Sequence, residues 1–504
     1  MTTKVVIPSQ GPMSRMLKVA KVASIVSNRI AKDSKEEQFL VQWQSASASD
    51  KPPLSWHNLS DLFMCLELVQ DYLDARDEAI KRAPPLSKTS LKRKAAHFEA
   101  DTDPPISFGL SLSSRSPSVA STTSSAPLSV DVYNGVLDRD EEGLYFCRSD
   151  PDAPQLSNAP TPEMVRISHQ SKVDKAYHRI RAKYVARLNK VPGKPIHLVN
   201  TYDQTSPSLR FRFIPEYILR EGVNKADPAT QEGCQSCSPH MGRCIGCEYT
   251  QKCECLEYAA VNEAAITDPT VMSAYREAKD KGNSLAKFPK RFPYYAEGTK
   301  IQRAGTLVPF YLDSRRPIYE CNDNCRCGLH CRNKNVQFGR TIDVEIFKTD
   351  GGRGWGLRCP QQLYQGQFID TYRGEVITDT EATLREETAG KAKASYLYSL
   401  DKFGESEGLS DEQLYVVDGE FFGGPTKFMN HSCEPNCRQY TVSYNKHDPF
   451  VYDIAFFACR DIPAGEELTF DYLDKEEGEP NEDPGPDAIP CLCGASKCRK
   501  WLWT

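Results

Sequence analysis

The two stretches that decide the fold are Asn430-His431-Ser432-Cys433 and Glu467-Leu468-Thr469-Phe470-Asp471-Tyr472. A dense group of cysteines, from Cys234 to Cys331, precedes both stretches, and Cys491-x-Cys493-x4-Cys498 follows them near the end of the chain. Cysteines at such short spacings are typical of metal ligands. The polar and aromatic residues between the two groups are therefore predicted to form an active site held between two metal-organised segments, which indicates an enzyme.

The composition limits the class of protein. The chain has 504 residues, 39% of them hydrophobic, and a net charge of −5, so it has no overall basic footprint for nucleic acid and any such contact must be local. No apolar run approaches the ~18 residues of a membrane span, and no signal peptide is evident, so we expect an intracellular protein without membrane association. In a reducing compartment, nineteen cysteines are better explained as metal ligands or buried thiols than as disulfides.

Residues 1–83 predict a small α+β module. Hydrophobic residues alternate with period two at 19–26 and 38–43, which indicates two short strands, and 62–73 has the pattern of a helix. The strand–strand–helix order and the place of Trp43 within it resemble a chromodomain.

A chromodomain binds methyl-lysine in a cage of aromatic rings, because a quaternary ammonium is weakly hydrated and attracted to ring faces. In this chain Trp43 takes the place of one cage wall, while Leu17 and Ala46 stand where the other two aromatic residues are expected. A cage with one wall binds poorly. We therefore favour a structural or protein-binding role for this divergent module over a working methyl-lysine reader.

A linker and a basic helix follow the first module. Residues 101–130 contain ten Ser and four Pro, a composition that cannot bury enough apolar surface to become ordered, so we predict a disordered linker over 84–165. Within 166–194, seven Lys/Arg and one Asp occur across 172–190, and the pattern predicts a basic amphipathic helix whose apolar stripe docks on the next domain. Its basic face is a candidate for weak contact with nucleosomal DNA, although a solvated face is the commoner explanation. The apolar stripe consists of Val173, Tyr177, Ile180, Tyr184 and Leu188.

From about residue 341 the chain turns to short strands separated by turns, which predicts a mostly β architecture. The first cysteine group has ten members, and thiolates spaced so closely suit tetrahedral zinc. Three tetrahedral zinc ions need twelve ligand positions, which nine thiolates supply if three of them bridge two metals. One cysteine is then surplus, and we predict that it is Cys247, because omitting it leaves the closely paired cysteines on either side intact. The predicted ligands are Cys234, Cys237, Cys244, Cys253, Cys255, Cys321, Cys325, Cys327 and Cys331; buried free thiols are the alternative.

The second cysteine group predicts another zinc site. Cys491, Cys493 and Cys498 make three ligands, one short of a closed tetrahedron, and no His lies nearby in sequence. Cys433 is the leading candidate for the fourth, because it sits in a turn-rich segment that would then be clamped to the C-terminus. The remaining cysteines are interpreted as ordinary buried thiols.

Several motifs occur in one order along 195–504. They are the first cysteine cluster, Gly354-Trp355-Gly356-Leu357-Arg358, Tyr372-Arg373-Gly374-Glu375, Ser395-Tyr396-Leu397-Tyr398-Ser399-Leu400-Asp401, Asn430-His431-Ser432-Cys433, Glu467 to Tyr472, and the final cysteine triplet. This part of the chain resembles a SET-domain protein lysine methyltransferase of the Suv39 family, of a fungal kind. The resemblance implies a SET-domain β-fold with pseudoknot-like threading of its C-terminal part. It also implies a pre-SET zinc module over 195–336, a catalytic SET domain over 337–475, and an acidic loop with a post-SET zinc module over 476–504.

The resemblance implies where the cofactor S-adenosylmethionine lies. It is expected against Gly354-Trp355-Gly356, Tyr396 and Asn430-His431. The chemistry agrees, because small residues let backbone groups approach a ligand closely, and Asn and His side chains satisfy its purine and amino-acid ends. No strand–GxGxxG–helix phosphate cradle is evident, which disfavours a Rossmann methyltransferase.

The resemblance also implies roles around the lysine. Tyr472 is expected to supply the catalytic hydroxyl that orients the amine, and Tyr396 to act between cofactor and lysine; a core tyrosine is the alternative for each. Phe470 takes the position where the family uses Phe or Tyr to limit the product, and Phe leaves room for trimethyl-lysine. Trp503 is expected to close one side of the substrate channel beside Phe470 and Tyr472. Lys427 departs from the family pattern, in which many relatives have Arg.

The function implied by the resemblance is methylation of the histone H3 tail at lysine nine, up to trimethyl-lysine, in heterochromatin formation and gene silencing. The expected partners are the H3 tail, the nucleosome and heterochromatin complex proteins, and the expected location is the nucleus, on chromatin. Two alternatives stay open at this point. One is a methyltransferase for another histone or non-histone lysine, and the other is a catalytically weak chromatin-binding protein.

Overall fold

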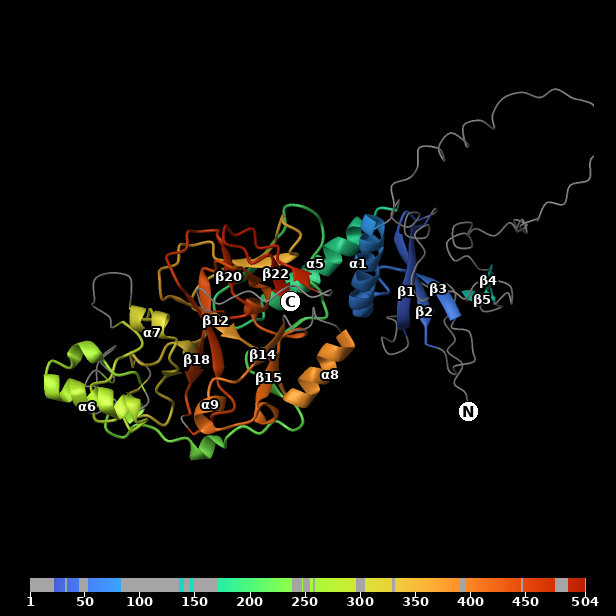
Figure 1. The fold of residues 1–504 in the computed structure, drawn as a ribbon. Helices are drawn as coiled ribbons and strands as arrows, with labels where there is room; N and C mark the ends of the chain where they lie inside the picture. Colours follow the sequence, from blue (N-terminus) through green and yellow to red (C-terminus); the bar gives the residue numbers. More distant parts are fainter. Residues whose placement is uncertain are drawn as a thin grey trace, which may run out of the picture. The chain divides into compact units, whose positions relative to one another are not determined.

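The computed structural model divides the chain into two compact units, 1–180 and 181–504, which we call the N-terminal and C-terminal units. Each is described by itself (Figure 1). The structure describes residues 22–31, 34–44, 53–82, 136–139, 145–148, 171–237, 247, 254–256, 259–295, 304–328, 331–389, 396–445, 447–475 and 488–503.

The N-terminal unit has one five-stranded sheet and one long helix. The strand order is β1-β2-β3-β5-β4, and every neighbouring pair is antiparallel. A short 3₁₀ turn, Phe63–Cys65, leads into α1, and the buried Leu62, Leu66, Val69 and Leu73 recur along it at helical spacing. The two predicted strands and the helix are present, but the helix is longer than expected, and a third strand that was not predicted, β3, lies between the second strand and the helix. The bounds are β1 Val22–Ile30, β2 Glu37–Trp43, β3 Pro53–Asn58, β4 Val136–Arg139, β5 Tyr145–Arg148 and α1 Leu66–Arg82.

The predicted cage wall, Trp43, is packed inside this unit. Its ring is 7% exposed, its Nε1 donates to Oγ of Ser55 at 2.7 Å, and the ring of His57 meets it edge-on at 5.6 Å. A ring held in this way does not form the wall of an open cage, so the interpretation of Trp43 as a cage wall is wrong for this structure. Leu17 and Ala46 lie outside the described residues.

The prediction of a structureless linker over 84–165 is wrong in two places. β4 and β5 form a hairpin, and β5 adds to the sheet beside β3, with Pro53 opposite Phe146. The composition argument rested on the Ser-rich segment 101–130, but strand-forming residues such as Val136 and Tyr145 lie beyond it. The rest of 84–165 lies outside the described residues.

The predicted amphipathic helix is confirmed as α5 (Asp174–Leu188), and the boundary between the two units falls within it. In the N-terminal unit, the buried carboxylate of Glu37 accepts hydrogen bonds from the backbone N–H groups of Lys175 (2.7 Å) and Ala176 (2.8 Å). These are N–H groups of the first turn, which have no partner within a helix, so Glu37 caps α5. The predicted stripe residues Val173, Ile180, Tyr184 and Leu188 are buried, and Tyr177 is partly buried.

The C-terminal unit is built from short strands in several small sheets, as expected for a mostly β protein. The largest has the order β17-β20-β11-β10-β6; the others are β12-β19-β18-β9, β14-β15-β13-β8, β16-β7 and β21-β22. The first strands are β6 Ile196–Val199, β7 Arg212–Phe213, β8 Ile218–Leu219, β9 Ile318–Tyr319, β10 Val344–Lys348, β11 Trp355–Arg358, β12 Phe368–Tyr372, β13 Glu375–Thr378 and β14 Leu397–Ser399. The rest are β15 Tyr415–Asp418, β16 Phe422–Gly423, β17 Asn430–His431, β18 Cys437–Ser443, β19 Asp453–Ala458, β20 Glu467–Phe470, β21 Ile489–Pro490 and β22 Trp501–Trp503.

Helices are short in the C-terminal unit. In α8, Ala382 packs with Ile377 of β13 and Val416 of β15, and Figure 1 shows α8 beside β15. Among the described residues, no helix has the length and apolar character needed to cross a membrane. The α-helices are α6 Pro269–Asp280, α7 Pro309–Ser314, α8 Asp379–Ala389 and α9 Gly404–Glu407, and 3₁₀ turns occur at Pro228–Thr230, Glu254–Leu256, Glu263–Ala265, Val336–Phe338, Asp411–Gln413 and Pro425–Phe428.

The main core of this unit is aromatic and centres on Phe457 of β19. Its ring lies 5.4 Å from that of Phe368 on β12, 5.5 Å from that of Tyr440 on β18, and 6.4 Å from that of Tyr294. All four side chains are buried. Because β19 is buried along its whole length, the chain that leads from it into β20 is anchored, and β20 carries the candidate site.

Candidate active site and cysteine centres

Three of the motifs predicted to act together meet in one sheet. β17 (Asn430–His431) runs parallel to β20, with Asn430 opposite Thr469 and His431 opposite Phe470. On the other side of β20, β11 pairs with it antiparallel, with Leu357 opposite Leu468. Segments more than a hundred residues apart in the sequence thus form one continuous surface, and strand pairing fixes their register.

The carboxylate of Glu467 joins the Gly354-Trp355-Gly356 turn to Asn430. Nδ2 of Asn430 donates to Oε1 of Glu467 at 2.7 Å and to the carbonyl of Trp355 at 3.2 Å, and Arg353 donates to Oε2 of Glu467 at 2.6 Å. Gly354 has a φ of +76°, which favours glycine, and a Cβ on Gly356 would lie 2.8 Å from Oε1 of Glu467. The backbone therefore favours glycine at Gly354, and a side chain at Gly356 would push Glu467 away from its contact with Asn430.

Tyr472 is half-buried beside this sheet. Its hydroxyl donates to the carbonyl of Met429 at 2.8 Å, and its ring lies 4.8 Å from that of Phe470 and 5.4 Å from that of His431. Burial, and then the nearby phenol of Tyr396, raise the pKa of Tyr472 well above its usual value. The hydroxyl is therefore protonated at neutral pH, and because it spends its proton on Met429, its oxygen lone pairs remain available to an N–H donor.

Tyr396 is partly buried and is held by several local contacts. Its carbonyl accepts hydrogen bonds from the hydroxyl of Tyr372 and the N–H of Gly419, each at 3.0 Å. Nζ of Lys427 lies 4.6 Å from the centre of the Tyr396 ring, which is an amino–aromatic contact. The structure thus places Tyr396 next to Lys427. The phenol of Tyr396 is also close enough to Tyr472 to raise the pKa of Tyr472.

His431 connects this site to a cysteine. Its Nδ1 accepts the backbone N–H of Tyr472 at 3.2 Å, so in the neutral ring the proton is on Nε2, which lies 3.3 Å from Sγ of Cys433. Burial lowers the pKa of His431 to about 4, so the neutral ring is the form present at neutral pH. A single imidazole therefore bridges the predicted cofactor segment and the predicted zinc ligand.

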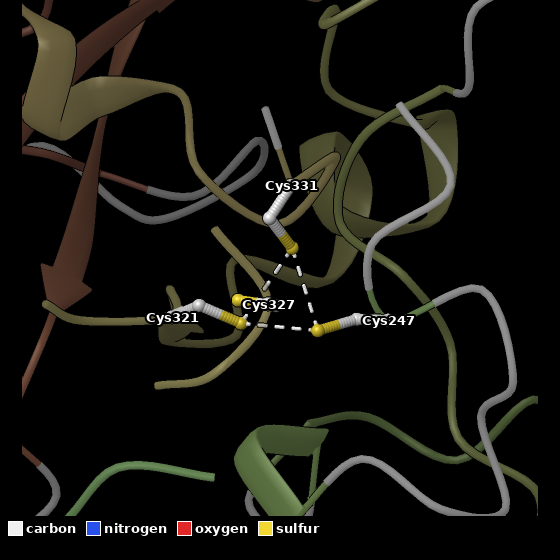
Figure 2. Close-up of side chains that lie close together, drawn as sticks. All are labelled: Cys247, Cys321, Cys327 and Cys331. Carbon is white, nitrogen blue, oxygen red and sulfur yellow. Dashed lines mark hydrogen bonds between the residues drawn. The ribbon is translucent and has the colours of Figure 1, made fainter. Parts of the chain in front are cut away.

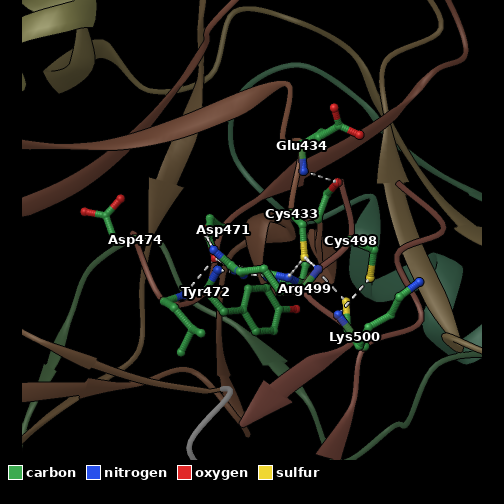
Figure 3. A network of polar contacts seen from close by, with 12 residues as sticks. Cys433, Glu434, Asp471, Tyr472, Asp474, Cys498, Arg499 and Lys500 are labelled. Carbon is green, nitrogen blue, oxygen red and sulfur yellow. Dashed lines mark hydrogen bonds and ion pairs between the residues drawn. The ribbon is translucent and has the colours of Figure 1, made fainter. Parts of the chain in front are cut away.

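The four cysteines predicted for the second zinc are brought together. The Sγ atoms of Cys433, Cys491, Cys493 and Cys498 all lie within 4.8 Å of one another. Cys433 and Cys491 are 3.8 Å apart, which matches the roughly 3.8 Å between sulfurs in a tetrahedron with Zn–S bonds of ~2.3 Å. Figure 3 shows Cys433 and Cys498 next to Tyr472 and Arg499. The thiols fit a closed structural zinc.

The first cysteine group also forms, with one correction. The sulfurs of Cys247, Cys321, Cys327 and Cys331 lie within 4.8 Å of one another, and Figure 2 shows them pointing toward a common centre. The prediction that Cys247 is surplus is therefore wrong. Its backbone has a left-handed φ of +59°, a conformation that non-glycine residues adopt at a cost and keep where the side chain is needed.

Other sulfur contacts extend the group. Cys321 also belongs to a trio with Cys255 and Cys325, as a thiolate that bridges two metals would. Cys237 lies 3.5 Å from Cys234 and 3.6 Å from Cys247. Hydrogen bonds from Cys247 and then Cys321 lower the pKa of Cys327 to about 4, which favours the thiolate that a metal requires. Two further predicted ligands, Cys244 and Cys253, lie outside the described residues.

Comparison with known proteins decides the family. The SET domain family model matches residues 354–473, and the Pre-SET motif model matches residues 188–334. The histone-lysine N-methyltransferase, H3 lysine-9 specific KMT1, of Fusarium mangiferae is 40% identical over 319 residues, which cover 61% of this chain and 88% of the relative. The chain belongs to the Suv39 family of SET-domain histone-lysine methyltransferases. The H3 lysine-9 specific enzyme dim-5 of Neurospora crassa is 38% identical over 318 residues, with the same coverage.

A solved structure of the Neurospora SET domain protein DIM-5, a histone lysine methyltransferase, aligns with 57% of this chain and 98% of its own, with a TM-score of 0.45 and 35% identity. The mostly β SET-domain fold expected from the sequence is confirmed. The Suv39 relatives match about three-fifths of the chain, and the two family models match residues from 188 onward, which lie in the C-terminal unit.

Two contacts at the SET site escaped the sequence analysis. Arg353 and Glu467 form an ion pair across the glycine turn, and Arg499 and Asp471 form another between the C-terminal tail and the end of β20. Opposite charges close to motif residues were the only signal, and such charges are common on solvated surfaces. The backbone of Trp503 lies in β22, opposite Ile489, while its side chain lies outside the described residues.

Proposed function

We propose that the protein transfers methyl groups from S-adenosylmethionine to lysine nine of the histone H3 tail, up to the trimethyl form. Membership in the histone-lysine methyltransferase family establishes the class of reaction, and the relatives from Fusarium and Neurospora that carry the H3 lysine-9 name support the target. The observation that carries the proposal is the parallel pairing of β17 with β20, which places Asn430 and His431 against the strand that ends in Phe470 and leads to Tyr472.

S-adenosylmethionine, when bound, supplies a methyl group activated by a sulfonium. The residues fit such a ligand, because Gly356 sits where a Cβ would collide with Glu467, and Asn430 is oriented by Glu467 and Trp355. We propose Gly354, Trp355, Gly356, Tyr396, Asn430 and His431 as the residues that hold it. The neutral ring of His431 and the amide of Asn430 add no positive charge beside a sulfonium.

The lysine amine must be neutral to attack a methyl group, and free lysine titrates near ~10.4. The aromatic surroundings of Phe470 and Tyr472 are poorly hydrated and disfavour the ammonium form. The Tyr472 hydroxyl donates to Met429 and keeps its oxygen as an acceptor, so it can take a hydrogen bond from the amine and orient the lone pair along the transfer path. Tyr472 is the proposed catalytic residue, with Tyr396 beside it.

Phe470 sets the proposed number of methyl groups. Its ring is buried between those of Phe456, at 4.7 Å, and Tyr472, at 4.8 Å. A hydroxyl on this ring would bind water and take room from a methylated amine, whereas the phenyl ring leaves that room. This supports trimethyl-lysine as the final product.

We also propose the domain assignment and setting. Residues 195–336 form a pre-SET module around three zinc ions, 337–475 the catalytic domain, and 476–504 an acidic loop and a post-SET module around a fourth zinc. The protein is proposed to act in the nucleus on nucleosomes, in heterochromatin. Direct DNA contact through α5 gains no support, because Arg181 and Arg187 donate to the carbonyls of Leu198 and Leu209 in the same chain.

The test uses the full chain with labelled S-adenosylmethionine and histone tail peptides. We expect transfer to the H3 peptide, loss of transfer when its lysine nine is replaced by arginine, and mass spectra that progress to three methyl groups. Transfer to another tail, or to H3 without lysine nine, would reassign the substrate. No transfer with zinc-replete, folded protein would leave only a chromatin-binding role.

A further inference from the structure

The C-terminal tail is held against the candidate site by a largely buried ion pair in addition to the cysteines. Nη1 of Arg499 donates to Oδ2 of Asp471 at 2.7 Å, and Nη2 donates to Oδ1 at 2.5 Å. The side chains are 15% and 11% exposed. Two parallel, charge-assisted hydrogen bonds fix both the distance and the orientation of the partners, which a single Lys contact cannot do.

Both ends of this pair adjoin residues of the site. Asp471 lies between Phe470 and Tyr472, accepts the backbone N–H of Leu473 at 3.1 Å, and has Oδ1 3.5 Å from Nδ1 of His431. The backbone N–H of Arg499 points to Sγ of Cys433 at 3.4 Å. Figure 3 shows Arg499 between Asp471 and the cysteine sulfurs.

A second tail contact serves as a comparison. Glu434 accepts hydrogen bonds from Oγ of Ser496 at 2.9 Å and from the backbone N–H of Lys497 at 3.1 Å, in exposed positions. Exposed contacts of this kind contribute little to stability, whereas removing one partner of a buried charge pair leaves the other charge uncompensated. The contact through Arg499 is therefore the one expected to hold the tail.

We propose that Arg499 is a positioning residue, which docks the tail segment leading into β22 (Trp501–Trp503) against Asp471 and so sets the substrate-binding side of the site. This inference rests on the proposed methyltransferase function. A zinc ion held by Cys498 would fix that residue and leave the chain free to rotate after it, and the bidentate pair at the next residue removes that freedom. The tail is then held at two successive residues, one through sulfur and one through a guanidinium.

The test compares Arg499→Lys with Ser496→Ala, which removes the exposed tail contact, and follows the tail without reference to turnover. Hydrogen exchange of tail amides over 488–503 should become at least ~10-fold faster in Arg499→Lys and stay unchanged in Ser496→Ala, because local opening governs exchange. Bound zinc should be equal in both. The KM for the H3 peptide should rise more than kcat falls in Arg499→Lys, since the tail forms a binding surface and the reacting groups remain.

An isosteric partner variant guards against a simple folding defect. Asp471→Asn keeps the acceptor for Leu473 but removes the charge. The double variant should exchange no faster than the faster of the two single variants, because the two residues act as a unit. Wild-type exchange rates in Arg499→Lys, or additive effects in the double variant, would overturn the proposal. Should the wild type transfer no methyl group, the exchange results would still decide whether Arg499 docks the tail.

Discussion

The two cysteine centres of the C-terminal unit use the same ligand chemistry but differ in burial and in what surrounds them. All four thiols of the Cys321 group are buried, whereas all four of the Cys433 group are partly exposed. Asn333 donates to the sulfurs of the first group, through its N–H to Cys331 at 3.3 Å and through Nδ2 to Cys321 at 3.5 Å. His431 and Arg499, which belong to the candidate site and its tail, contact the sulfur of Cys433 in the second.

This difference predicts two different roles for the zinc ions that the two groups could hold. A buried group whose neighbours are structural residues acts as a brace, and its metal contributes to folding. A partly exposed group that contacts the candidate site and the tail is expected to act as a clasp for the tail, and loss of a metal there would free the segment 488–503. The comparison predicts that stability and activity separate when each centre is damaged alone.

The largest effect is expected from Cys321→Ser. The Cys321 sulfur belongs to two thiol groups, so its loss weakens two metal positions at once. Structural zinc contributes about 10–16 kcal/mol, which is comparable to the roughly 5–15 kcal/mol that stabilises a typical domain. We expect calorimetry to show no cooperative transition for the C-terminal unit and metal analysis to show lost zinc.

The matched control is Cys359→Ser, at a buried thiol outside both groups among the described residues. It should retain all zinc and a cooperative transition. Normal zinc content and cooperative unfolding in Cys321→Ser would mean that these sulfurs are ordinary buried thiols. The proposal that a metal at the Cys321 group stabilises the fold would then be wrong.

The next largest effect, on activity, is expected from Cys498→Ser. Loss of this ligand should release the tail and lower methyl transfer by roughly 100-fold, while the melting temperature of the C-terminal unit falls by only a few degrees. Transfer assays and calorimetry on the same sample measure both. A collapse of the melting transition like that of Cys321→Ser would show that the two centres are one structural element.

The sequence was most informative where ligand geometry constrains it. Three cysteines near the end of the chain demand a fourth ligand, and Cys433 was the cysteine in a turn-rich motif; its sulfur does lie with the other three. Likewise the motif order predicted a SET domain, and the β17–β20 pairing brings the two decisive stretches together. These conclusions hold because they depend on covalent spacing and coordination number.

The sequence was least informative where side-chain direction decides. Ten cysteines at close spacing cannot show which thiol faces away, and the left-handed backbone of Cys247, which turns it into the cluster, has no sequence signal such as glycine. The pair of Arg499 with Asp471 joins residues 28 positions apart, on a tail whose path depends on metal binding. Pairing of β5 with β3 was missed because a Ser-rich segment separates them in sequence.

A change at the candidate site itself, Tyr472→Phe, should reduce kcat by a factor of about 10²–10⁴. Neither cysteine centre should lose zinc. It also leaves the Met429 carbonyl without its partner, at a cost of about 1–3 kcal/mol. Because burial raises the pKa of Tyr472, its hydroxyl stays protonated beyond its ordinary value of ~10. The ratio of wild-type to variant kcat should therefore be constant from pH 7 to about 10 in stopped-time transfer assays.

Tyr217→Phe is the matched control for this change, because the Tyr217 hydroxyl also donates to a backbone carbonyl, that of Tyr452, at 3.2 Å. It should cost similar stability and leave kcat within about twofold, as expected for a hydrogen bond outside the site. Equal losses of kcat in the two variants would assign Tyr472 a structural role. The Cys433 group would then lie next to a core residue and not next to the reacting groups.

The smallest change in rate, but a change in product, is expected from Phe470→Tyr. The ring lies between Phe456 and Tyr472 and is buried, so the new hydroxyl must find water or a polar partner, and either reduces the space for a methylated amine. Mass spectrometry of a long reaction should then stop at mono- or dimethyl-lysine, with the first transfer slowed by less than about tenfold. Phe421→Tyr, at an exposed ring, should still give trimethyl-lysine. If Phe470→Tyr still produced trimethyl-lysine, the space beside β20 would not limit the number of methyl groups added. The C-terminal tail held by the Cys433 group would then be the element that limits it.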